Sequence, residues 1–195
     1  TVDKRYLSDT DAGGREKFVD KEEQQIAFTP DLADLSILEK ESSSANGFAQ
    51  TKAKMLAAYE KEQQYPQELR TPLAGFAALQ LNSDYRVLTF DNPIAETRTS
   101  FFHKSIGGYH GAKMKRYQEL IDFQISQNNM EVLNMLNTKY FIVPTKEDLP
   151  FPRRNPDAMG NAWFVNEYKL VENADSEIVA LNDFSPREEA IIDKR

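Results

Sequence analysis

His103 and His110 are the only histidines of the chain, and they flank a pair of glycines at positions 107 and 108. Glycine tolerates positive φ angles and lets the backbone approach a ligand closely. If a helix begins here, the backbone N–H groups of Gly107, Gly108 and Tyr109 can hold an anionic group such as a phosphate or a sugar acid. The competing interpretation is structural, with both histidines capping or hydrogen-bonding a local loop.

Positive side chains gather around these glycines, although the chain as a whole is acidic, with 24 Lys and Arg against 31 Asp and Glu. Lys104 and Lys113 are placed to assist an anion site, and Arg98 lies in the same stretch. A scattered, solvated face is the alternative explanation for these charges. We therefore predict a ligand site that consists of His103, Lys104, Gly107, Gly108, Tyr109, His110 and Lys113.

The sequence contains no recognisable motif for metal binding, phosphate binding or nucleophilic catalysis. The spacing of the histidines, with two glycines between them, does not place metal ligands on one helix face, and the absence of Cys excludes thiolate sites and disulfides. The sequence contains no P-loop, no serine nucleophile elbow and no zinc spacing. We assign no catalytic residue, metal or cofactor. The formal net charge of −7 argues against nucleic acid as a partner.

Two strands and a long helical connection are predicted around the glycines. Residues 85–90 are β-favouring and bounded by turn formers, and residues 140–143 form a compact apolar run. Between them, apolar side chains recur at helical spacing over residues 114–125 and 130–136, whereas residues 94–105 show no period and are expected to form a loop. This order predicts a parallel βαβ core with a right-handed crossover, in which loops at the carboxyl ends of the strands host ligands.

The first part of the chain is predicted to be helical. Helices are expected over residues 30–40, 48–64 and 74–81. Thr29 is the expected N-cap of the first helix, and Pro66 and Pro72 are expected to break the chain after the second. The polarity of the second helix is typical of a surface helix, such as one arm of a hairpin.

The last part is predicted to alternate between loops, strands and a short helix. The expected elements are a proline-rich loop at 146–158, a strand at 162–171, a helix at 175–181 capped by Asp175, and a strand at 190–192. Trp163, Phe164 and Tyr168 can stack on sugar rings, although aromatic residues along a strand more often belong to the core. The complete prediction is an α/β fold whose parallel βαβ core is flanked by helices, with a helical part at 1–83 and an α/β part at 84–195, packed as one unit.

Several segments together resemble a known family. They are Tyr85–Leu88, Phe102–Lys113, Tyr117–Leu120, Leu133–Val143, Asn161–Val165 and Asp3–Leu7. This set is similar to the C-terminal region of YfhO-like bacterial membrane proteins, in particular the large versions of Bacteroides-type bacteria. The resemblance covers residues 85–195 well and the first forty loosely, and residues 42–81 have no counterpart in it.

The resemblance implies a domain on the extracytoplasmic (periplasmic) side of the cell membrane. Members look like multi-spanning proteins related to glycosyltransferases that use lipid-linked sugars. By resemblance, the chain has an accessory or glycan-positioning role, and its partners are the membrane-embedded part of the same polypeptide and a glycan or lipid-linked sugar. Because the chain begins at Thr1 and contains no long apolar window, we expect it to be part of a longer protein. A structural or protein-interaction module is the alternative, and an independent hydrolase is a third hypothesis.

Overall fold

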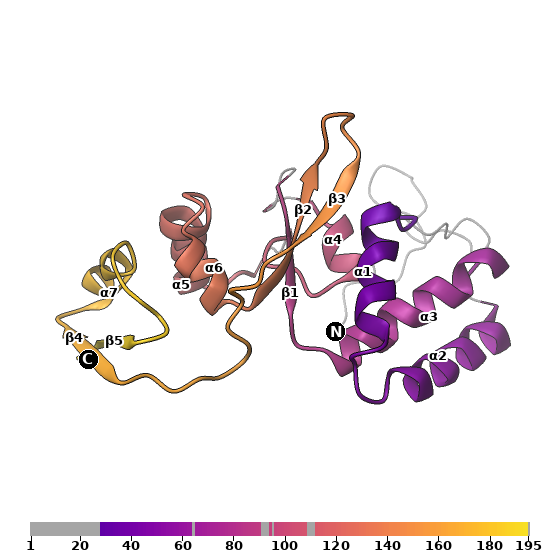
Figure 1. Ribbon diagram of the computed structural model, residues 1–195, viewed down its shortest axis with the longest axis horizontal. Coiled ribbons are helices and arrows are strands. Elements are labelled where there is room, and N and C mark those ends of the chain that lie inside the picture. Colours follow the sequence, from indigo (N-terminus) through magenta and orange to yellow (C-terminus); the bar gives the residue numbers. More distant parts are fainter. Residues whose placement is uncertain (1–27, 64, 91–93, 95, 109–111, 195) are drawn as a thin grey trace, which may run out of the picture.

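The computed structural model describes residues 28–63, 65–90, 94, 96–108 and 112–194. Helices and two small sheets combine in this part of the chain, which confirms the predicted α/β fold. Figure 1 shows three regions in a row: a helical group on one side, a three-stranded sheet in the middle, and a C-terminal unit on the other side, reached by a long connection.

The helical group contains α1 (Leu32–Ser42), α2 (Phe48–Glu62) and α3 (Gln67–Asn82). Helix α1 begins later than predicted, because Asp31 and not Thr29 is the N-cap: its carboxylate accepts from the Asp34 N–H, and Asp34 accepts from the Asp31 N–H. As predicted for a surface helix, α2 has no buried residue.

Helix α3 corrects the prediction of a break at Pro72, which lies inside the helix. A proline in a helix clashes with the carbonyl of the residue four positions earlier and leaves it without a donor. Here that residue is Glu68, in the exposed first turn, where water can satisfy the carbonyl. The helix therefore starts at Gln67, seven residues before the predicted position 74.

The central sheet has the order β1 (Arg86–Thr89), β2 (Thr138–Pro144), β3 (Pro150–Arg154). Strands β1 and β2 pair in parallel, and β2 and β3 form an antiparallel hairpin. Strand β3 overturns the prediction of a loop throughout 146–158. Its prolines are tolerated because β3 is at the edge of the sheet, where an N–H facing away from the partner strand is not needed.

In its described residues, the connection from β1 to β2 contains four helical segments: α4 (Arg98–Phe102), α5 (Lys115–Leu120), the π-helix η2 (Ile121–Ile125) and α6 (Met130–Met135). The short helix α4 lies within the predicted loop at 94–105, and its five residues are too few for a periodic pattern to appear. The expectation that a helix begins directly at Gly107 and Gly108 is wrong, because α5 starts only at Lys115.

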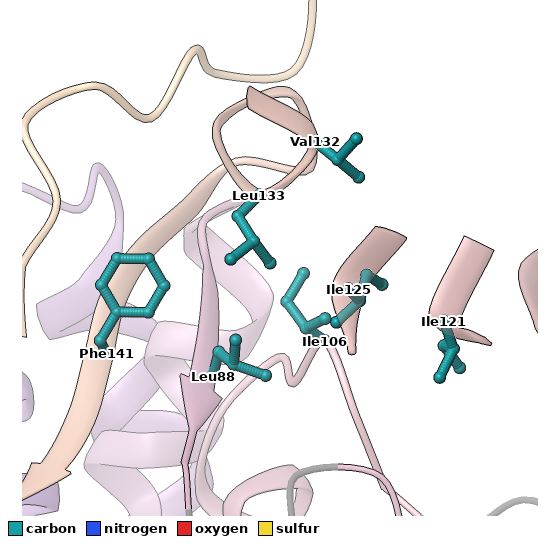
Figure 2. Packing of buried hydrophobic residues seen from close by; sticks show 7 residues of the cluster. All are labelled: Leu88, Ile106, Ile121, Ile125, Val132, Leu133 and Phe141. Carbon is teal, nitrogen blue, oxygen red and sulfur yellow. The ribbon is translucent and has the colours of Figure 1, made fainter. Parts of the chain in front are cut away.

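Apolar side chains pack on both faces of the central sheet. On one face, Leu88 and Phe141 point toward side chains of the connecting helices (Figure 2). On the other face, Val87, Tyr140 and Ile142 pack with α1 residues Ala33 and Ile37. Successive residues of each strand thus face opposite sides, and the sheet is buried between α1 and the helices of the connection.

The C-terminal unit consists of β4 (Glu167–Val171), α7 (Ala174–Ala180) and β5 (Glu189–Asp193), with β4 and β5 parallel. The strand predicted from residue 162 begins only at Glu167. The N-cap of α7 is Asn173, whose side chain accepts from the Ser176 N–H, and not the predicted Asp175.

Candidate functional site

A cavity of about 730 Å³ lies at the carboxyl ends of the parallel strands β1 and β2. Its walls are formed by Thr89, Phe90, Ile142, Val143 and Pro144 at these strand ends, by Asp148 and Pro150 of the hairpin, and by Asp31, Glu96, Arg98 and Thr99. Ligands in open α/β sheets bind in this kind of position. This cavity is our candidate site.

A group of charged side chains fixes one wall of the cavity. The Arg98 guanidinium lies 2.9 Å from the Asp31 carboxylate and also donates to Asp34 Oδ2. His103 Nε2 lies 3.1 Å from Asp34 Oδ1. Since an ionised carboxylate only accepts, His103 Nε2 must carry the proton in this contact. One carboxylate on α1 thus positions both Arg98 and His103.

The environment of Asp34 keeps its carboxylate ionised. Burial by itself raises the pKa of Asp34, because its side chain is fully buried. The hydrogen bond from His103 and the one from the Asp31 N–H act in the other direction. Together with the attraction of His103 and Arg98, they hold the pKa of Asp34 below its ordinary value of 3.8.

Glu96 lies in the wall of the cavity, and its two carboxylate oxygens differ in their hydrogen bonding. Its Oε2 accepts from the Thr99 N–H at 2.9 Å, near the beginning of α4. Its Oε1 is buried and has no hydrogen-bond partner among the described residues. An unpaired buried carboxylate oxygen is costly, so it favours a donor supplied from outside the protein. Since Oε1 is buried, it can accept from a ligand only if the Glu96 side chain turns toward the cavity.

The cavity combines the groups that recognise polyhydroxylated molecules. Glu96 and Asp148 supply acceptors, and the Arg98 guanidinium, whose side chain is 29% exposed, supplies donors. Phe90, 39% exposed, offers an apolar ring face. Within the described part of the chain, no group of three or more His, Asp or Glu side chains could hold a metal ion. The arrangement suits binding and orientation of a polar ligand.

Among the described residues of the predicted glycine site, His103 and Lys104 have partners outside it. His103 is 4% exposed and is engaged by Asp34 in the core. Lys104 donates to the Ser83 carbonyl and lies 3.2 Å from the Asp84 carboxylate. Lys113 is half-buried, and Tyr109 and His110 lie outside the described residues.

Gly107 and Gly108 do not form a helix N-terminus because the chain before them runs beside β1. The Val87 N–H donates to the Lys104 carbonyl, and the Ile106 N–H donates to the Val87 carbonyl. The Gly107 N–H is already bound to Ser105 Oγ at 3.0 Å. The Gly107 N–H is therefore not available for the predicted anion site, and Gly108 has the positive φ, 102°, that glycine favours.

The acidic residues of the candidate site were not predicted from the sequence. The positive charge of Arg98 is visible in the sequence. The contact between Asp34 and His103 is not, because the two residues are 69 positions apart. One signal was present: an acceptor at position 31 followed by an acidic residue three positions later is a capping-box pattern. That pattern would have placed both carboxylates in the first turn of α1.

Comparison with known proteins adds no relative. No family model matches the chain, and neither a curated protein nor a solved structure is found to be similar to it. Among the described helices, none is long and apolar enough to span a membrane.

Proposed function

We propose that this chain is an accessory domain that holds a glycan in the cavity at the carboxyl ends of β1 and β2. The observation that carries the proposal is the cavity itself, at the carboxyl ends of two parallel strands, whose wall contains Glu96 and Arg98. A sugar hydroxyl can donate to the Glu96 carboxylate while a neighbouring ligand oxygen accepts from the Arg98 guanidinium. The ring of Phe90 can pack against the apolar face of a pyranose.

The membrane context of the proposal rests on the family resemblance. In that context the glycan is part of a lipid-linked sugar, and the domain lies on the extracytoplasmic side, attached to a membrane-embedded part of the same polypeptide. We also propose that β1, its connecting helices and β2 form a right-handed βαβ core. A gene that encodes no membrane-spanning helices before Thr1 would rule out the membrane context.

Saturation-transfer NMR with the chain and a panel of neutral and acidic saccharides tests the glycan proposal. Glu96→Gln removes the charged acceptor, and we expect it to weaken binding about tenfold. Glu60→Gln, on the exposed α2, is the matched control and should leave affinity unchanged. If no saccharide binds at millimolar concentration, or if Glu96→Gln binds as well as the unmodified chain, the glycan proposal is rejected.

A protein-interaction module is the second candidate, and the C-terminal sheet favours it. Tyr168, Leu170 and Ile192 share one face of β4 and β5 and are 67%, 51% and 45% exposed. Parallel sheets are normally covered on both faces, and two strands alone are marginally stable. Under this hypothesis, Leu170→Ser should abolish co-purification with a membrane-embedded partner, while Glu96→Gln should have no effect. The opposite pattern would favour the glycan proposal.

A further inference from the structure

A second cavity, of about 560 Å³, lies between α5 and the C-terminal unit. Its walls carry large apolar and aromatic side chains, among them Met114, Tyr117, Leu120, Trp163 and Phe184. Its volume is in the range of small-molecule sites, about 300–1,000 Å³.

The aromatic walls are fixed and their polar groups are already satisfied. The Trp163 Nε1–H donates to the Pro186 carbonyl at 2.6 Å, and the Tyr117 hydroxyl donates to the Ile106 carbonyl at 2.6 Å. These bonds hold both rings in place. The apolar part of the wall around them can take the apolar part of a ligand.

Acidic side chains dominate the charged part of the wall. Glu119, Glu177 and Glu189 stand against a single basic residue, Arg116. Arg116 is engaged by Glu177 at 3.3 Å and by Asp193 at 3.6 Å, so its positive charge is largely offset. Lys115 lies 3.5 Å from Glu119 in the same way, so two cations stand against four carboxylates, Glu119, Glu177, Glu189 and Asp193. The remaining negative charge favours a cation and opposes an anion.

We propose that this cavity binds a small apolar ligand with a positively charged head, that is, an alkylammonium compound. The apolar chain occupies the space between α5 and the C-terminal unit. The ammonium group lies among the glutamates and near the aromatic rings, whose faces attract cations. This site is separate from the cavity at the carboxyl ends of β1 and β2, and it shares none of its residues.

Trp163 is the only tryptophan of the chain, so its fluorescence reports directly on this cavity. We would titrate the chain with octyltrimethylammonium, and with octanol and octanoate as ligands of matched chain length. The expected result is a saturable change in Trp163 emission with the ammonium compound. Octanol should bind about tenfold more weakly, and octanoate more weakly still.

Two variants locate the binding. Ala174→Leu places extra atoms in the cavity wall and should weaken octyltrimethylammonium binding about tenfold, whereas Ala180→Leu, on the same helix but outside this wall, should not. Glu177→Gln should weaken binding of the ammonium compound and leave octanol unaffected. Thermal unfolding followed by circular dichroism verifies that each variant is folded.

Three results would contradict the alkylammonium proposal. If none of the three ligands changes Trp163 emission, the cavity is not a binding site. If octanol or octanoate binds as tightly as octyltrimethylammonium, the cationic head is wrong. Equal affinity of the Ala174→Leu and Ala180→Leu variants would place the ligand elsewhere and overturn the assignment.

Discussion

Asp34 connects α1 to both ends of α4 through one carboxylate. Its two oxygens take hydrogen bonds from Arg98 and His103, and a backbone N–H of the helix start completes the set. Removing one partner of a buried ion cluster leaves the others with uncompensated charge or unmade bonds. We expect Asp34→Asn to lower the free energy of unfolding by about 3–5 kcal/mol, measured in urea. The exposed Asp183→Asn is the control and should change it little.

Because the pKa of Asp34 is lowered by folding, we expect the folded chain to lose stability in acid. The pKa of Asp34 is lower in the folded chain than its ordinary value of 3.8, so the stabilisation from its ionised form is complete above 3.8. It is lost as the pH falls through the lower, folded value. Urea unfolding below pH 3.8 should therefore show a steep decline for the unmodified chain and a shallower one for Asp34→Asn. Identical slopes would show that Asp34 does not contribute.

Because two tyrosines are buried, we expect the folded chain to lose stability at high pH as well. Burial first, and then the nearby Glu41 carboxylate, raises the pKa of Tyr85 and of Tyr140 well above the ordinary value of 10.0. Tyr140 also donates its hydroxyl to Glu41 Oε1 at 2.7 Å. The stability that the neutral hydroxyls provide is present below pH 10.0 and is lost as the pH rises above it.

Absorbance at 295 nm measures this ionisation. We expect Tyr85 and Tyr140 to ionise only together with unfolding, as a late, cooperative step in the alkaline titration. Tyr140→Phe should reduce the amplitude of that step. If all tyrosines of the unmodified chain titrate near pH 10.0 while the chain remains folded, the burial argument is wrong.

At the scale of elements, the close contact between α1 and α3 depends on Gly75. A Cβ atom at this position would lie 3.1 Å from both methyl groups of Leu38. Gly75→Leu should overpack this contact and destabilise the chain by about 1–3 kcal/mol in thermal or urea unfolding. Ala77→Leu, half-buried on the same helix, is the matched control and should be tolerated. Equal stability of both variants would mean that the helices can separate without cost.

The sequence allowed the inner elements to be predicted better than the outer ones. The apolar runs at 85–90 and 140–143 predicted β1 and β2 closely, because β-favouring side chains buried on both faces leave a continuous apolar pattern. Edge strand β3 was missed because prolines are common in loops, and α4 because it is too short to show a period. The start of α5 was placed too early, since pairing of residues 104–106 with β1 is a long-range contact that local periodicity does not reveal.

The candidate site was predicted only in part, for the same reason. Arg98 was recognised as one of several clustered cations, and the carboxyl ends of the strands were expected to host a ligand. Glu96 has no distinguishing sequence context, and its unpartnered oxygen is a property of the folded arrangement. Phe164 and Tyr168, for which a core position was favoured, are exposed instead, because the sheet that carries Tyr168 has only two strands.

At the scale of the whole molecule, the C-terminal unit contacts α5 partly through charges. Arg116 connects α5 to Glu177 on α7 and to Asp193 on β5. Exposed ion pairs contribute only about 0–1 kcal/mol each, so this connection is weak. We expect Arg116→Ala to speed hydrogen exchange within residues 167–193 while leaving residues 138–144 unchanged. Uniform acceleration over both segments would mean that the two parts unfold together.

The two sheets differ in whether another polypeptide can extend them. In the central sheet, residues 104–106 lie along the outer side of β1, and Pro150 and Pro152 deprive the outer border of β3 of N–H donors. A foreign chain therefore finds no continuous row of donors and acceptors there. Strands β4 and β5 contain no proline. Any association of this protein by strand addition should accordingly start at the C-terminal pair, and segments taken from it are the ones to screen for fibril formation.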